Sequence, residues 1–171
     1  LLVLSNPENG MPEAILDGTL ISSMRTGAVS AAAFANLCKK EVKQAVCCGA
    51  GVQARQQLRA LCTVKPKLEQ VYIWGRTEEK ARRLGAELSA EFPQIHISSV
   101  KDFQEVVREC DVVIAATPAA VPYLKKEHFK ENCFYLQIGM NEIEEEALNA
   151  FDAIISDDFD KGIANSRQSV Y

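Results

Sequence analysis

The sequence predicts an α/β protein built on a doubly wound parallel sheet. From about residue 45 onward, short apolar runs alternate with amphipathic stretches of helical length. The runs are apolar almost without interruption, which is typical of strands in a sheet covered on both faces. A turn with two glycines, Gly49 and Gly51, follows the first run before a helical pattern begins. These three observations favour strand–helix–strand units with right-handed crossovers.

Six runs are strand candidates, and four stretches between or after them are helix candidates. The expected strands are 45–48, 71–74, 95–98, 112–116, 134–138 and 153–156. The expected helices are 52–63, 78–91, 102–109 and 143–149. Thr77 and Asp102 stand where a side-chain oxygen caps a following helix, and Glu78 and Glu79 place carboxylates in a first turn.

The first forty residues do not continue this alternation. Residues 1–4 and 14–16 flank a turn with the sequence N-P-E-N-G, which predicts a β hairpin. An alanine-rich stretch from Arg25 to Lys40 predicts a helix. Because an isolated hairpin is only marginally stable, we expect this chain to be a piece of a larger protein.

Composition narrows the class of protein. The 171 residues are 47% hydrophobic and carry a net charge of −4, which suits a globular domain with a real core. No basic run with interleaved aromatic residues indicates nucleic-acid binding. No apolar stretch approaches the roughly 20 residues that span a membrane, and residues 1–4 lack the basic flank of a signal peptide. We therefore expect a cytoplasmic protein without nucleic-acid or membrane partners.

The polar residues outside the turns indicate no metal site. The six cysteines form no C-x-x-C pair and only two histidines are present, so reduced core thiols are expected. We expect His96 and His128 to be surface or structural residues. Four glutamates, Glu142 and 144–146, are expected to form a solvated helix start.

The glycine-rich turn predicts a phosphate-binding loop. Residues 49–54 read G-A-G-V-Q-A, which fits G-x-G-x-x-[GA] between a strand and a helix. Gly49 allows a tight turn, and Gly51 lets the backbone approach a pyrophosphate. The start of the following helix, at Val52 and Gln53, offers free amides to the phosphates. The pattern, together with the surrounding alternation, predicts a dinucleotide cofactor in a Rossmann-like domain.

The end of the second strand favours NADP over NAD. An acidic residue there normally binds the ribose 2′-hydroxyl, but this strand exits through Gly75, Arg76 and Thr77. Arg76 can pair with a 2′-phosphate, and Lys80 adds charge one turn later. A solvated arginine at a helix start is the alternative interpretation, and NAD remains open.

Two later strands end in residues suited to the same edge of the sheet. Ala116 and Thr117 follow the fourth strand, where a threonine hydroxyl can donate to the cofactor. The fifth strand leads into Ile138, Gly139 and Met140, where a glycine allows the backbone to lie close to a nicotinamide.

These segments resemble the ornithine cyclodeaminase/mu-crystallin family. The residues that carry the resemblance are R-T-G-A at 25–28, G-A-G-V-Q-A at 49–54, A-A-T-P at 115–118 and I-G-M at 138–140. The order matches over nearly the whole chain. The resemblance implies that 1–20 is a remnant of a substrate and dimerisation domain. It further implies that 21–156 is the NAD(P)-binding domain and that 157–171 returns toward the missing part.

The resemblance also implies roles for individual residues. Arg25 matches the arginine that binds a substrate carboxylate, for which a guanidinium fork is well suited. Thr26 and Gln53 match residues near the dinucleotide phosphates and ribose. Thr117, Ile138 and Gly139 match the nicotinamide side. The full-length protein is expected to be a homodimer.

Asn141 departs from the family's pattern. Ornithine cyclodeaminases carry an aspartate just after the strand-five glycine turn, and a neutral amide cannot act as a carboxylate base. We therefore expect an NADP-dependent imine reductase or amino-acid dehydrogenase that acts on a small amino or imino acid, rather than a true cyclodeaminase. The alternatives are a shikimate-dehydrogenase-like or glutamyl-tRNA-reductase-like NADP domain, and a non-catalytic nucleotide- or ligand-binding module.

Overall fold

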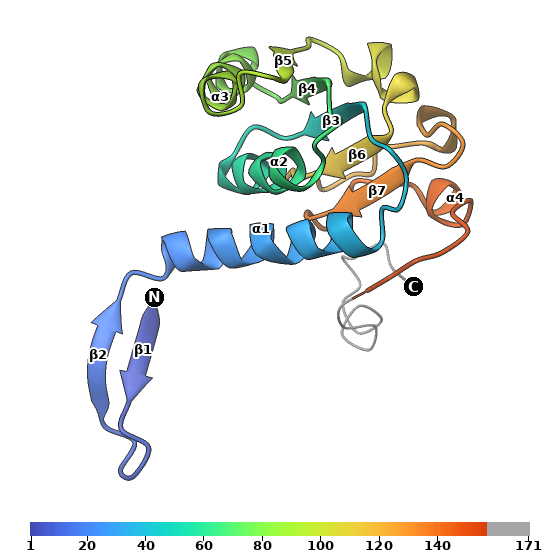
Figure 1. The fold of residues 1–171 in the computed structure, drawn as a ribbon. Helices are drawn as coiled ribbons and strands as arrows, with labels where there is room; N and C mark the ends of the chain where they lie inside the picture. The colour runs from blue at the N-terminus through green and yellow to red at the C-terminus, as the bar shows by residue number, and fades with distance from the viewer. Residues whose placement is uncertain (157–171) are drawn as a thin grey trace.

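Five parallel strands form the central sheet of the computed structural model, which describes residues 1–156. The strands pair in the order β5-β4-β3-β6-β7, so the chain crosses over after β5 and continues on the other side of β3. The bounds are β3 Gln44–Cys48, β4 Gln70–Trp74, β5 His96–Ser99, β6 Val112–Ala115 and β7 Phe134–Gln137. The predicted doubly wound α/β fold is confirmed (Figure 1).

Alternate residues of the sheet face opposite cores. Ala45 and Cys47 of β3 belong to one hydrophobic cluster, whereas Val46 and Cys48 belong to the other. All four are fully buried, as expected of a strand covered on both faces. This explains why the strands read as continuous apolar runs.

Three helices cover the first face of the sheet. They are α1 Thr19–Asn36, α2 Val52–Val64 and α3 Glu78–Glu91. Apolar side chains such as Phe34, Leu58 and Leu88 are fully buried against the strands. A Cβ atom at Gly27 would lie 3.0 Å from the Cβ of Gln56, so the absence of a side chain there lets α1 approach α2.

Shorter elements cover the second face. They are the 3₁₀ turns η1 Phe103–Glu105, η2 Val107–Glu109 and η3 Lys126–His128, and the helix α4 Glu145–Leu148. The prediction of one helix over 102–109 is wrong: Asp102 accepts a hydrogen bond from the Gln104 amide as expected, but Val106 (φ −122°) leaves helical geometry and splits the segment. Thr77 occupies the N-cap of α3 without a side-chain cap hydrogen bond.

Two other expectations need correction. Residues 153–156 form no strand, because Ile154 and Ile155 lie exposed and no strand of residues 1–152 lies beside them to pair with. The helix α1 begins at Thr19 rather than Arg25; Gly18 is its N-cap, and the Asp17 carboxylate just before it accepts a hydrogen bond from the Thr19 amide. It ends at Asn36, short of Lys40.

The predicted hairpin is present and stands away from the sheet. The strands β1 Leu2–Ser5 and β2 Pro12–Leu16 pair antiparallel and extend beyond the N-terminal end of α1 (Figure 1). Several of their apolar side chains are exposed, including Val3, Leu4 and Ile15. The division at residues 20 and 21 stays a prediction, and the expected tail at 157–171 lies outside the described residues.

Candidate functional site

A pocket of about 700 Å³ opens at the carboxyl edge of the sheet. It is formed by the turns that follow β3 and β4 and by the segment after β6. The parallel pairing of β3 with β4 and β6 brings these three turns to one edge. The lining residues are Gly49–Val52, Arg55, Trp74–Thr77, Lys80, Arg83, Leu84, Ala116–Ala119 and Tyr123.

Gly49 and Gly51 shape the floor of this pocket in different ways. Gly49 has φ +131°, and a Cβ there would overlap the Ala116 carbonyl group. Gly51 is the N-cap of α2, and no side chain caps this helix start with a hydrogen bond. No other atom lies within 4 Å of the place that a Cβ atom on Gly51 would take. The first amides of α2 thus face the pocket without a capping side chain, as an anion-binding helix start requires.

Basic side chains gather on the β4–α3 side of the pocket. Arg76, Lys80 and Arg83 line it together with Arg55, whose Nη2 lies 2.7 Å from Glu87 Oε2. Within residues 1–156, neither Arg76 nor Lys80 forms an ion pair, and no carboxylate lines the pocket. The local charge therefore favours an anionic ligand group beside β4.

The opposite rim is built around Thr117. The Thr117 amide and its Oγ1 each donate a hydrogen bond to Glu142 Oε1, both at 3.0 Å. Glu142 is fully buried, so the expectation of a solvated residue is wrong. The run of glutamates looks hydrophilic in sequence, but its first member turns inward under the segment after β6. Burial raises the pKa of the Glu142 carboxyl against the lowering effect of the Thr117 hydrogen bonds.

The structure brings together eight of the predicted cofactor residues. Those that line the pocket are Gly49, Gly51, Val52, Arg76, Thr77, Lys80, Ala116 and Thr117. Gly139 lies directly behind this rim, since a Cβ there would overlap the Glu142 carboxylate and the Thr117 carbonyl oxygen. The backbone of this edge thus carries most of the site that the sequence indicates.

Other predicted residues lie outside the pocket lining. Ile138 donates its amide to the Ala115 carbonyl oxygen at 2.8 Å, and Met140 is exposed. The Asn141 side chain donates to the Ala120 carbonyl oxygen at 2.9 Å.

Three predicted residues on the two neighbouring helices also lie outside the pocket. Arg25 is exposed on α1, and the Thr26 hydroxyl donates to the Ser22 carbonyl oxygen within the same helix. Gln53 of α2 has a buried Oε1 without a partner among the described residues.

Nine lining residues were not predicted as site residues: Ala50, Arg55, Trp74, Gly75, Arg83, Leu84, Pro118, Ala119 and Tyr123. Trp74 is the last residue of β4, so the rule that ligands lie at strand ends would have found it. Arg55 and Arg83 follow predicted residues by one helical turn, three positions after Val52 and Lys80. Nothing in the local pattern indicates Tyr123, whose place depends on tertiary contacts.

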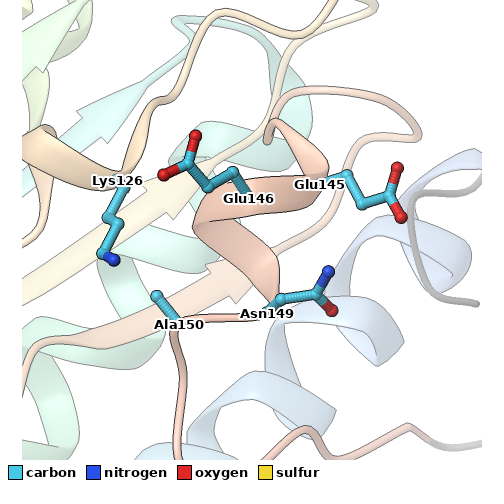
Figure 2. A pocket seen from close by; sticks show the side chains of 5 residues that line it. All are labelled: Lys126, Glu145, Glu146, Asn149 and Ala150. Atoms are coloured by element: carbon cyan, nitrogen blue, oxygen red, sulfur yellow. The ribbon is translucent and has the colours of Figure 1, made fainter.

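A second hollow lies on the surface by α4. Figure 2 shows its five lining residues, which are Lys126 of η3, Glu145 and Glu146 of α4, and Asn149 and Ala150 just after α4. It contains none of the predicted site residues. Two of its lining side chains, Glu145 and Glu146, are carboxylates in the first turn of α4, which disfavour the phosphates of a dinucleotide.

The remaining candidate side chains have structural roles. His128 is buried, and its Nδ1 accepts a hydrogen bond from the Lys125 amide at 3.0 Å. Burial raises the pKa of the Cys47 thiol to about 12. Within residues 1–156 no group of metal-binding side chains is found, and no helix there has the length and apolarity to cross a membrane.

Comparison with known proteins shows to which family the chain belongs. The sequence profile of the ornithine cyclodeaminase/mu-crystallin family matches residues 1–155. The chain belongs to this family. The resemblance expected from the sequence is thus confirmed, and the match favours this family over the shikimate-dehydrogenase-like and glutamyl-tRNA-reductase-like alternatives.

The similar proteins include dehydrogenases, reductases and cyclodeaminases. The chain is 28% identical to N-((2S)-2-amino-2-carboxyethyl)-L-glutamate dehydrogenase of Staphylococcus aureus, over 93% of this chain and 47% of that protein. It resembles the structure of Thermococcus litoralis Delta(1)-pyrroline-2-carboxylate reductase in complex with NADH and L-proline. That match has a TM-score of 0.78 and 33% identity over 85% of this chain and 46% of the other.

A second solved structure is also similar. The iminosuccinate reductase of Paracoccus denitrificans in complex with NAD+ matches with a TM-score of 0.80 and 27% identity, over 94% of this chain and 50% of that one. The chain thus spans about half the length of these family members.

Proposed function

We propose that this chain is the nicotinamide-dinucleotide-binding part of an oxidoreductase that acts on the Cα–N bond of a small amino or imino acid. The pocket at the carboxyl edge of β3, β4 and β6 carries the proposal. The pocket has a glycine turn, a helix start without a side-chain cap and a group of basic side chains. Two similar structures were solved in complex with NADH and with NAD+. The pyrophosphate lies at the first turn of α2 in this proposal.

We propose NADP as the preferred cofactor, with NAD as the alternative. Arg76 and Lys80 line the pocket without ion pairs among the described residues, and no carboxylate there would repel a 2′-phosphate. A guanidinium binds a phosphate through two parallel hydrogen bonds, whereas an uncharged ribose hydroxyl offers it no such pairing.

The chemistry that we propose is imine reduction or its reverse. When bound, a reduced nicotinamide would supply a hydride to the imine carbon, and solvent or a side chain would supply a proton to the nitrogen, so that a C=N bond becomes a C–N bond. Arg25 is the proposed carboxylate-binding residue and Asn141 the proposed catalytic-site residue near the amine. Thr26, Gln53, Ile138, Gly139 and Met140 are proposed cofactor contacts. A neutral Asn141 favours reduction over cyclodeamination.

We further propose that the full-length protein is a cytoplasmic homodimer. Exposed apolar side chains on the hairpin and on α1 support an interface, including Leu4, Ile15, Leu20 and Met24. These side chains lie away from the pocket lining.

Nucleotide titration tests the cofactor proposal. Trp74 is the only tryptophan and lines the pocket, so its emission should transfer to the bound reduced nicotinamide. We expect NADPH to quench Trp74 emission at a lower concentration than NADH does. Failure of both nucleotides to bind would refute the proposed function, and equal affinities would refute the preference for NADP.

Enzyme assays with the full-length protein test the reaction. We expect NADPH oxidation with cyclic imino acids, or with keto acids supplied together with an amine. Nucleotide binding without turnover of any of these substrates would identify the protein as a binding module instead of an enzyme.

A further inference from the structure

Glu142 is a buried carboxylate at the rim of the pocket. Its side chain is fully buried, and its Oε1 accepts both hydrogen bonds that Thr117 donates. Its Oε2 is also buried and has no hydrogen-bond partner among the described residues. Such a carboxylate is costly to bury, so its presence beside a ligand pocket requires a reason.

The same residue joins the segment after β7 to both ends of the 117–124 segment. The Glu142 carbonyl oxygen accepts hydrogen bonds from the Tyr123 and Leu124 amides, at 2.9 and 2.8 Å. Leu124 also forms a parallel bridge with Ile143. The carboxylate fills the space where a side chain on Gly139 would lie. Thus the segment after β7 holds both ends of the 117–124 segment that lines the pocket.

The hydrogen bonds set the direction in which the Thr117 hydroxyl points. Glu142 Oε1 accepts from both the Thr117 amide and the Thr117 hydroxyl, so the single proton of Thr117 Oγ1 is directed at this oxygen. The Tyr123 hydroxyl, 3.5 Å from Thr117 Oγ1, can then only act as the donor of that long contact. One lone pair of Thr117 Oγ1 then remains to accept a hydrogen bond from a ligand. This is opposite to the expectation that Thr117 donates a hydrogen bond to the cofactor.

We propose that Glu142 is a positioning residue of the cofactor site, which holds the 117–124 rim and orients Thr117 Oγ1 as a hydrogen-bond acceptor. The ligand group that suits this acceptor is an N–H or O–H donor, such as the nicotinamide carboxamide or a ribose hydroxyl. The inference rests on the proposed binding of a nicotinamide dinucleotide in this pocket.

A double-mutant cycle with NADPH as the probe tests the inference. We expect both Glu142→Ala and Thr117→Val to weaken NADPH binding about tenfold, the effect of losing one useful hydrogen bond to a charged or ordered group. Because the two residues act through one contact, we expect the double variant to bind as weakly as either single variant. Glu142→Gln keeps an oxygen acceptor, so this variant should retain most of the NADPH affinity of the wild-type protein.

A matched control separates positioning from stability. Glu145→Gln removes a carboxylate from the same segment, but Glu145 is exposed and does not line the pocket. We expect unchanged NADPH affinity for this variant. A purely structural role of Glu142 would lower thermal stability of Glu142→Ala while the folded protein bound NADPH normally, and that result would overturn the inference.

A second measurement covers the case in which Glu142→Ala does not fold. In nucleotide-free protein, the Thr117 amide proton should resonate far downfield and shift in Glu142→Gln, because its acceptor changes from a carboxylate to an amide. An unshifted Thr117 amide would overturn the inference. Absence of NADPH binding by the wild-type protein would refute the proposed function, whereas normal wild-type binding with an unaltered NADPH affinity of Thr117→Val would refute this inference alone.

Discussion

Gly49 and Gly51 look equivalent in the sequence, but their surroundings differ. The φ of +131° at Gly49 and its contact with the Ala116 carbonyl group leave no room for a side chain. Gly51 has an extended conformation with φ −97° and open space at its Cβ position. The first glycine is needed for the fold of the turn, and the second keeps the helix start open to a ligand.

We expect Gly49→Ala to lower the free energy of unfolding by about 2–4 kcal/mol, from backbone strain and overlap with Ala116. Gly51→Ala should fold with normal stability but weaken binding of NADPH, because the new methyl group stands between the α2 amides and the phosphates. Thermal unfolding and nucleotide titration of both variants measure this contrast. Equal stability of the two variants would contradict it.

We expect Arg76→Ala to weaken NADPH binding about tenfold and to leave NADH binding within twofold, because only NADPH has a 2′-phosphate to pair with the guanidinium. Arg82→Ala is the matched control. Arg82 lies on the same helix, α3, but pairs with Glu79 and does not line the pocket. Parallel losses for both nucleotides in Arg76→Ala would contradict the assignment.

The Glu142 carboxyl links folding stability to pH. Burial raises its pKa in the folded protein above the ordinary 4.5, so the folded state binds a proton more tightly than the unfolded chain. Burial also raises the pKa values of the neighbouring Tyr123, Tyr135 and Cys48 groups, which therefore stay neutral below about pH 8.

We therefore expect the wild-type protein to lose stability relative to Glu142→Gln as the pH rises from 4.5 through the raised pKa. The slope should be at most about 1.4 kcal/mol per pH unit, and the difference should be constant at lower pH. Denaturant unfolding of both proteins between about pH 4 and 8 measures it. A wild-type protein that gained relative stability over this range would contradict the raised pKa.

Asp111 organises the edge of the sheet opposite the pocket. Its carboxylate accepts hydrogen bonds from the Lys43 and Gln44 amides at 2.7 and 2.9 Å, and Lys130 Nζ lies 2.5 Å away. Its backbone bonds to Gln44 and Phe134 on either side, so Asp111 ties β3, β6 and β7 together where they begin. Burial opposes ionisation, but Lys130 and the two amides outweigh it and lower the Asp111 pKa.

We expect Asp111→Ala to lower the free energy of unfolding by about 2–3 kcal/mol at neutral pH, since two amides lose a charged acceptor. The lowered pKa means that this contribution is complete above the ordinary pKa of 3.8 and is lost as the pH falls through the folded value. Urea unfolding against pH measures the effect. NADPH affinity of the folded variant should not change, because Asp111 lies at the far edge.

The elements themselves differ in how well their local sequence predicts them. Long periodic segments such as 52–63 and 78–91 are helices within one residue of the expected bounds. The weaker pattern at 102–109 divides into two 3₁₀ turns, because Phe103 and Val107 are both drawn into the core on the second face. Packing decides a short segment whose own helical preference is small.

An apolar surface follows the hairpin and the first half of α1. We expect Leu20→Lys combined with Met24→Lys to convert the dimer that we propose into a monomer, since the two exposed side chains lie one turn apart on α1. Sedimentation measures the mass. Ala86→Lys, at an exposed position of α3, is the control and should leave the mass unchanged. A monomeric wild-type protein would contradict the proposed interface.

Apolar periodicity and the glycine turn determined the α/β class, five of the strands and the position of the turn between β3 and α2, because these depend on neighbours close in sequence. The parallel strand order then brought most of the expected cofactor residues to one edge. The contact of Glu142 with Thr117, 25 positions away, depended on the tertiary structure. So did the place of Tyr123 and the failure of 153–156 to form a strand. Burial and hydrogen-bond partners from distant segments decide these features, and no local pattern records them.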